Sequence, residues 1–277
     1  MTATASENQK RMLRLPAFRA EEMQAAAAET AAIFDQITSV ATAPIPDYRT
    51  AYTICMTPRS GSTFLAQAMS KSAVFGHPQE YLHRLEPSAL AAHAARYGAK
   101  SWESYLAALA AHTRTGNGVF GLKADPNMLL PLLIDGTFDR TLAHGKFIYV
   151  TRTDLVMQAI SLTKAQYTGS WSSQVDPIAV PQFSFGAIYG NILHLAEMMG
   201  RWESFFAYNG IAPLRITYER IDADIDAVLR DIASFLHVAS PKPSARGAKA
   251  HQRDDVSIAW RHQFQAALAP TQFAEIP

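Results

Sequence analysis

One uninterrupted stretch of the chain carries a strand pattern, a short turn and a helix pattern. Residues 52–56 read Tyr-Thr-Ile-Cys-Met, an apolar run rich in strand formers. The turn at residues 57–63 holds small and hydroxyl-bearing side chains, and apolar Phe64, Leu65 and Met69 then recur at helical spacing. Backbone N–H groups at the start of such a helix, together with the helix dipole, bind oxyanions. The stretch therefore predicts a phosphate-binding loop between a strand and a helix.

The turn differs from the loop of nucleoside triphosphatases, whose sequence G-x-x-x-x-G-K-[ST] supplies a lysine. If that pattern is laid over Gly61, Met56 stands where the first glycine belongs and Ser62 where the lysine belongs. The cation comes instead from Arg59, whose planar guanidinium can bind two oxygens of a phosphate or sulfate. The alternative is an ordinary strand-to-helix turn that Ser60 or Ser62 caps. Other parts of the chain must decide between these interpretations.

Composition limits the remaining choices. The 277 residues are 48% hydrophobic and 18% charged, which fits one large α/β domain or such a domain with an appendage. Lysine and arginine number 25 against 24 for aspartate and glutamate, so no overall field favours nucleic acid or an anionic membrane. Any anion site must therefore be local. The single cysteine, Cys55, lies within the apolar strand, which indicates a buried thiol and excludes a disulfide framework.

Strand and helix patterns alternate along the rest of the chain. Strands are expected at residues 52–56, 119–123, 146–151 and 214–218. Helices are expected at residues 21–37, 87–97, 101–113, 154–167 and 185–209, and a further one begins at Asp222. This alternation predicts an α/β fold with a parallel sheet, helices on both faces, and a ligand at the carboxyl ends of the strands. Residues 169–182 form a long loop of the kind that often covers a binding site.

A cation follows each of the first three expected strands. These residues are Arg59, Lys123 and Arg152. In nucleoside triphosphatases a strand usually ends in an acidic residue that holds Mg²⁺, whereas Arg152, with Ser161 on the following helix, suits a second phosphate. Two anion sites without a metal indicate a nucleotide with a phosphate at each end of its ribose. The alternative is that Arg152 only pairs with Asp154 at the start of a helix.

Several short motifs support the first interpretation when they are taken in chain order. They are Thr-Pro-Arg-Ser-Gly-Ser-Thr at residues 57–63, Gly-His-Pro-Gln-Glu-Tyr at 76–81, Asn-Gly-Val-Phe-Gly-Leu-Lys at 117–123, Arg152 with Ser161, Thr-Tyr-Glu-Arg-Ile at 217–221, and His-Gln-Arg-Asp-Asp at 251–255 with Trp260. In this order they resemble the sulfotransferases that use 3′-phosphoadenosine 5′-phosphosulfate, and most closely the bacterial carbohydrate sulfotransferases of the trehalose sulfotransferase type. The resemblance covers most of the chain after Tyr48 and implies their phosphate-loop, nucleotide-kinase-like fold.

The resemblance also implies a donor site for 3′-phosphoadenosine 5′-phosphosulfate without a metal. Arg59 would serve the 5′-phosphosulfate, and Arg152 with Ser161 the 3′-phosphate. Lys123 is expected to stabilise the bridging oxygen as the leaving phosphate gains charge. The residues that the resemblance assigns to the donor are Arg59, Ser60, Gly61, Ser62, Thr63, Arg152, Ser161 and Arg253.

The acceptor side follows from the motif at residues 76–81. Glu80 is expected to act as the general base that takes the proton of the acceptor hydroxyl, with His77 and His83 as rival bases. In the trehalose enzyme a second carboxylate occupies the place of His77, and this difference argues against trehalose itself as the acceptor. The residues expected to contact the acceptor, a sugar or glycolipid, are His77, Gln79, Glu80 and Trp171.

The domain organisation divides the chain near its N-terminus. Residues 1–47 are expected to form a helical extension with a linker at residues 43–47, and residues 48–277 the sulfotransferase domain. The amphipathic helix at residues 21–37 is expected to dock on its own domain or on a second subunit, so a homodimer is one expectation. We expect a cytoplasmic protein with no membrane span, no nucleic-acid partner and no metal. The alternatives to a sulfotransferase are a small-molecule kinase on the same fold and a catalytically inactive nucleotide-binding module.

Overall fold

The structure is a computed structural model that describes residues 18–35, 48–83, 87–142, 144–171, 178–243 and 255–268. Within these ranges the chain forms a four-stranded parallel sheet in the order β2-β1-β3-β4. The strands are β1 (Thr50–Met56), β2 (Val119–Ala124), β3 (Lys146–Thr151) and β4 (Leu214–Thr217). The α/β fold with a parallel sheet is therefore confirmed.

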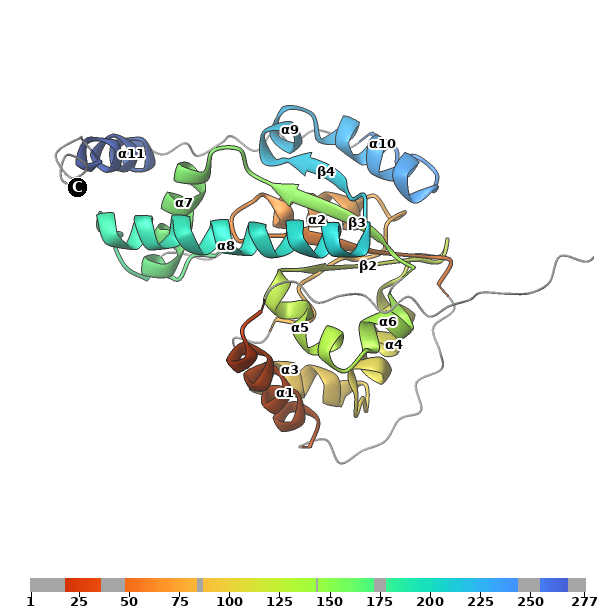
Figure 1. The fold of residues 1–277 in the computed structure, drawn as a ribbon. Coiled ribbons are helices and arrows are strands. Elements are labelled where there is room, and N and C mark those ends of the chain that lie inside the picture. The colour runs from red at the N-terminus through yellow and green to blue at the C-terminus, as the bar shows by residue number, and fades with distance from the viewer. Residues whose placement is uncertain are drawn as a thin grey trace, which may run out of the picture.

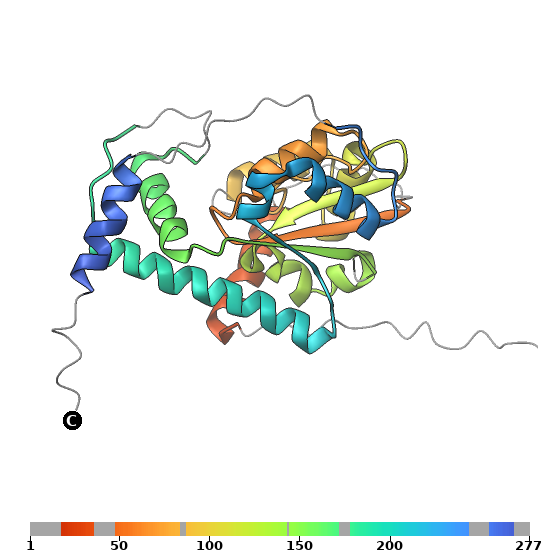
Figure 2. The same ribbon diagram turned by 90° about the horizontal axis from the view of Figure 1, so that it is seen from above.

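Helices connect the strands and cover both faces of the sheet, as Figure 1 and Figure 2 show. They are α1 (Ala20–Phe34), α2 (Ser62–Lys71), α3 (Pro87–Arg96), α4 (Trp102–Thr113), α5 (Pro126–Ile134), α6 (Thr137–Thr141), α7 (Leu155–Thr168), α8 (Phe185–Asn209), α9 (Tyr218–Ala223), α10 (Ile225–Leu236) and α11 (Asp255–Ala267). The sequence patterns predicted most of these helices but missed α5, α6, α9 and α11.

Alternating side chains of the strands enter two different cores. Tyr52 and Ile54 of β1 pack against α2 and α10 on one face of the sheet. Ala51 and Cys55 pack on the other face, within a core that includes α4, α5 and the C-terminal half of α8. This alternation is the period-two pattern of a strand that is buried on both faces. Cys55 is fully buried, and burial raises the pKa of its thiol well above the ordinary value, as expected for a structural cysteine.

A third core lies beyond the edge of the sheet. The N-terminal half of α8 extends away from the strands and packs against α7 and α11 (Figure 2). Phe264 of α11 stacks on Phe185 of α8 with ring centroids 4.9 Å apart, and Trp260 is buried beside them. None of the helices in the described ranges combines the length and the apolar character that crossing a bilayer requires.

Helix starts follow local capping signals. Ser101 caps α4 by accepting a hydrogen bond from the Ser104 N–H at 3.2 Å, as its position predicted. The helix expected to begin at Asp222 begins instead at Ile225 as α10, because Asp224 ends a short preceding helix, α9, and caps α10 through the Ala227 N–H. The missed helix α5 also carries a recognisable signal, since Asp125 caps it and Pro126 occupies its first position.

The N-terminal helix α1 docks on its own chain. It packs against α3 and α5, and its last two residues, Ile33 and Phe34, belong to the large core. The Phe34 ring meets Trp102 edge to face with centroids 5.0 Å apart, and the Trp102 indole N–H donates to Thr30 Oγ1 at 3.2 Å. Of the two partners expected for this helix, the structure places it on its own domain. The linker at residues 43–47 lies outside the described residues.

We expect Phe34→Ala to lower the free energy of unfolding by about 3 kcal/mol, because it opens a cavity between α1 and α4. The measurement is equilibrium unfolding in urea. Tyr208→Ala is the matched control, since Tyr208 is 53% exposed and its truncation opens no cavity. If the two variants lost equal stability, α1 would not be part of the folded core.

Candidate functional site

The loop at residues 57–61 and the start of α2 form one compact turn. Gly61 is the N-cap of α2 with φ of 83°, and its carbonyl accepts the Leu65 N–H at 3.1 Å. No side chain caps this helix, so the interpretation of a turn capped by Ser60 or Ser62 is wrong. A Cβ on Gly61 would lie 2.6 Å from Cδ2 of Tyr218. Both the left-handed backbone and the close ring require glycine here.

Buried side chains hold this loop from behind. The amide of Gln158, on α7, donates to Thr57 Oγ1 at 2.9 Å and to the Pro58 carbonyl at 2.7 Å. The Trp202 indole N–H donates to the carbonyl of Met56 at 2.9 Å, at the end of β1. The buried Oγ of Ser60 has no hydrogen-bond partner in the structure. Because buried polar atoms normally have partners, this hydroxyl fits a site that receives a polar ligand.

Two guanidinium groups converge beside the loop. Arg59 donates from Nε to Ser161 Oγ at 2.9 Å and from Nη1 to the carbonyl of Trp171 at 2.6 Å. Arg152 lies over the ring of Tyr218 at 4.5 Å from its centroid, and its buried Nε has no partner. Burial lowers the pKa of Arg59, and the nearby charge of Arg152 lowers it further. Two half-buried like charges of this kind favour an anion between them.

Arg59 and Ser161 were expected at opposite ends of a nucleotide, yet the structure brings them into contact. Arg59 has a left-handed backbone with φ of 62°, from which its long side chain reaches α7. Sequence spacing gave no sign of this contact, because the two residues are 102 positions apart.

The alternative role for Arg152, pairing with Asp154, is not what the structure shows. The Asp154 carboxylate caps α7 through the Met157 N–H at 3.0 Å and accepts Arg261 Nη1, from α11, at 2.7 Å. Glu219 follows Tyr218, and its carboxylate accepts the Thr153 N–H at 3.2 Å. Burial alone would raise the pKa of Glu219, but its hydrogen bonds lower it below the ordinary value. The turn after β3 is thus fixed by carboxylates, and Arg152 remains directed at the tyrosine ring.

Lys123, at the end of β2, connects the start of α2 to the segment that carries Glu80. Its ammonium lies 2.6 Å from Glu80 Oε1 and donates to Thr63 Oγ1 at 2.8 Å. Lys123 is only 3% exposed, and its backbone N–H donates to the Gln79 carbonyl at 3.0 Å. Residues from three separate motifs of the sequence therefore meet at one cation.

Tyrosines support the segment that carries Glu80. Tyr81 donates its hydroxyl proton to the His77 carbonyl at 2.5 Å, and Tyr105 of α4 donates to the Tyr81 carbonyl at 3.0 Å. His93 Nδ1 lies 2.6 Å from the Tyr105 hydroxyl. The support from Tyr105 and His93 was not predicted, because a single tyrosine on an apolar helix face looks like ordinary core packing.

A cavity of about 960 Å³ opens in front of these groups. This is the upper part of the usual range for small-molecule sites. The predicted site residues that line it are Arg59, Ser62, Thr63, Gln79, Glu80, Lys123 and Trp171, together with the rival base His83. Those absent from its lining are His77, Ser60, Gly61, Arg152 and Ser161. Arg253 lies outside the described residues, so its predicted donor contact stays a prediction.

Five polar residues of the cavity lining, from three helices, were not predicted to belong to the site. Glu22 and Glu29 come from α1, Asp125 and Asn127 from the start of α5, and His194 from α8. The Asp-Pro start signal of α5 was available in the sequence, whereas nothing local linked α1 to the site. The described ranges hold no group of three or more His, Cys, Asp or Glu side chains suited to a metal ion.

Comparison with known proteins shows the family to which the chain belongs. A family described as Stf0 sulphotransferase matches residues 51–267 of the chain. A trehalose 2-sulfotransferase of Mycolicibacterium smegmatis is 24% identical over 260 residues, and the match covers 79% of this chain and 96% of that protein. A trehalose 2-sulfotransferase of Mycobacterium tuberculosis is 27% identical over 249 residues, and that match covers 74% of this chain and 91% of that protein. The chain is thus a sulfotransferase that belongs to the Stf0 family.

Proposed function

We propose that this protein transfers a sulfuryl group from 3′-phosphoadenosine 5′-phosphosulfate to a hydroxyl of a sugar. The observation that carries the proposal is the convergence of Arg59, Arg152 and Lys123 on the start of α2, with the carboxylate of Glu80 bound to Lys123. Cations at a helix start suit a donor rich in anionic oxygens. Membership of a sulfotransferase family supports the reaction, and the names of the two mycobacterial relatives support a sugar acceptor.

The residues present fit the donor. The loop N–H groups, the Ser60 hydroxyl and Arg59 would hold the 5′-phosphosulfate, and Arg152 with Ser161 the 3′-phosphate. The unpartnered Ser60 Oγ and Arg152 Nε supply buried hydrogen-bonding atoms for these anions. Because Arg59 already bonds Ser161, one guanidinium with several N–H groups stands within reach of both anion positions.

The chemistry is a direct transfer. The acceptor oxygen forms a bond to sulfur while the bond from sulfur to the bridging oxygen breaks, and adenosine 3′,5′-bisphosphate leaves with that electron pair. Glu80 takes the hydroxyl proton, and Lys123 stabilises the charge that develops on the bridging oxygen. A covalent sulfated cysteine is not part of this proposal, because Cys55 is fully buried and burial raises the pKa of its thiol.

The donor assignment predicts which nucleotide stabilises the protein. Adenosine 3′,5′-bisphosphate without Mg²⁺ should raise the melting temperature by about 5 °C at a hundredfold excess over its Kd. Arg152→Ala should weaken binding of this nucleotide by about tenfold or more, through lost charge-assisted hydrogen bonds, and should change the affinity for adenosine 5′-phosphate little. Thermal-shift and calorimetric titrations measure both effects.

The matched control is Arg220→Ala, since Arg220 pairs with Asp231 on the surface and does not line the cavity. Stabilisation by Mg-ATP alone would instead indicate the kinase. An Arg152→Ala variant that still preferred the 3′-phosphorylated nucleotide would show that the second phosphate binds elsewhere. Nucleotide binding without any sulfated product from trehalose and a panel of other sugars, measured by mass spectrometry, would indicate the inactive binding module.

Glu80→Gln tests the general base. The amide keeps the shape of the side chain and one acceptor oxygen for Lys123, but it cannot take a proton. We expect kcat to fall by about a hundredfold or more, with the affinity for adenosine 3′,5′-bisphosphate unchanged. A variant within a few-fold of wild type, together with an inactive His77→Ala or His83→Ala, would assign the base to that histidine instead.

Gly61→Ala tests the loop as the donor cradle. The added methyl group would force the Tyr218 ring to move, and with it the guanidinium of Arg152 that lies over that ring. We expect stability to fall by about 1–3 kcal/mol, from the left-handed backbone, and donor-product affinity to fall at least tenfold. Gly186→Ala, where nothing lies within 4 Å of the added atom, is the control. Unchanged nucleotide affinity in Gly61→Ala would place the donor away from this loop.

A further inference from the structure

Helix α1 lies outside the part of the chain that matches the family, yet it forms a wall of the cavity. The family match begins at residue 51, whereas α1 ends at Phe34. Its cavity-lining residues are Glu22, Ala25, Ala26 and Glu29. These positions follow the i, i+3, i+4, i+7 pattern, so they occupy a single face of the helix. That face places two small side chains between two carboxylates, and the small side chains leave room for a ligand.

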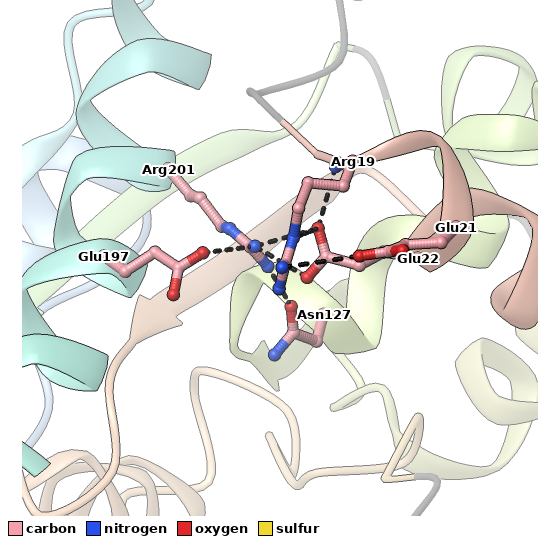
Figure 3. A network of polar contacts seen from close by, with 6 residues as sticks. All are labelled: Arg19, Glu21, Glu22, Asn127, Glu197 and Arg201. Atoms are coloured by element: carbon pink, nitrogen blue, oxygen red, sulfur yellow. Dashed lines mark hydrogen bonds and ion pairs between the residues drawn. The ribbon is translucent and has the colours of Figure 1, made fainter. Parts of the chain in front are cut away.

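A buried arginine anchors the N-terminal part of this wall (Figure 3). Arg201 of α8 donates from Nη2 to both oxygens of Glu22, at 2.7 and 3.0 Å, and to Glu197 at 2.7 Å. Its Nη1 donates to Asn127 Oδ1 of α5 at 2.7 Å. Arg201 itself is only 6% exposed and does not line the cavity, whereas Glu22 and Asn127 do. One guanidinium thus fixes cavity-lining side chains from two helices.

The charge of the Glu22 side chain follows from its contacts. Burial would raise its pKa, but hydrogen bonds from the Arg19 backbone N–H and from Arg201 lower it below the ordinary value. Glu22 is therefore an anion at neutral pH, oriented from one side by Arg201 and from the other by the start of its own helix. Charged oxygens held in this manner make strong, directional acceptors for hydroxyl donors.

The charges that line the cavity divide into two sets. The cations are Arg59 and Lys123, which the proposed reaction assigns to the phosphosulfate. Glu80 belongs to the same end, through its ion pair with Lys123. The remaining carboxyl side chains in the lining are Glu22, Glu29 and Asp125. An anionic acceptor would meet like charges there, whereas an uncharged sugar would supply hydroxyl donors to them.

We propose that α1 is the acceptor-selecting wall of this sulfotransferase, that Glu22 binds a hydroxyl of an uncharged sugar, and that Arg201 is the positioning residue for Glu22. The inference rests on the proposed function and adds to it a specificity determinant outside the family match. It also limits the acceptor class, because it excludes sugars that carry a carboxylate at this end.

Steady-state sulfation of trehalose, or of the panel sugar that the wild-type protein sulfates fastest, tests the proposal. Glu22→Gln should raise the acceptor KM about tenfold, with kcat and the donor KM within twofold of wild type. Arg201→Lys keeps the charge but loses the two separate nitrogens that hold Glu22 and Asn127, and it should raise the acceptor KM similarly. Since Arg201 acts through Glu22, the double variant should raise the KM no further than the larger single effect.

Two comparisons make the result specific. Glu203→Gln removes an exposed carboxylate that pairs with Arg215. Glu203 lies on the same helix, α8, but does not line the cavity, so every kinetic constant should stay unchanged. The wild-type protein should prefer glucose over glucuronic acid by about tenfold or more in kcat/KM, and Glu22→Gln should narrow this preference.

Two results would overturn the inference while leaving the proposed function intact. One is an unchanged acceptor KM in Glu22→Gln, and the other is equal use of glucose and glucuronic acid by the wild-type protein. A lower kcat and a lower melting temperature, with the donor KM raised as much as the acceptor KM, would also overturn it and would show that the Arg201 network serves only stability. A wild-type protein that sulfates no sugar would overturn the proposed function as well.

Discussion

The buried ammonium of Lys123 is the constraint on which the site depends. A charge that is almost fully removed from water is costly unless hydrogen-bonding and charged partners surround it. Its partners come from different parts of the chain, because Glu80 lies in the segment after α2 and Thr63 in the first turn of α2. The need to satisfy one cation therefore ties the end of β2, the start of a helix and an irregular segment into one rigid arrangement. The same arrangement places the Glu80 carboxylate beside the N-terminus of α2.

Much of the arrangement around Lys123 and the loop at residues 57–61 could be predicted from the sequence, because the sequence signals for it are local. A strand, a glycine-containing turn and a helix in succession define the loop, and the parallel sheet brings the residues after β1, β2 and β3 to one edge. The contact between Arg59 and Ser161 could not be predicted in this way, since the partner of a long, flexible side chain depends on which residues the folded chain brings near it. The same holds for Glu22, whose place in the cavity depends on an arginine far along the sequence.

The two sides of the site that we propose for donor and acceptor are built by different means. The loop beside the proposed donor position depends on a left-handed glycine that packs on Tyr218, so its shape is fixed by main-chain geometry. The proposed acceptor side uses side chains from α1, α5 and α8 that meet at Arg201. Changes on α1 and α5 can alter the proposed acceptor side without disturbing the loop, because neither helix supplies the turn between β1 and α2, whereas α8 also holds the end of β1 through Trp202.

The Glu22 to Arg201 bond spans 179 positions of the chain, and this span bears on the order in which the protein assembles. During synthesis from the N-terminus, α1 emerges long before α8, so its carboxylate must wait until three strands and most helices have left the ribosome. Contacts of such wide sequence separation carry a high loop-closure cost and form late in folding. The loop at residues 57–61 also gains its supports late, because Gln158 of α7 and Trp202 of α8 hold it. The strand, turn and helix around this loop can therefore form locally, but both sides of the cavity gain their final shape only after α8 has been made.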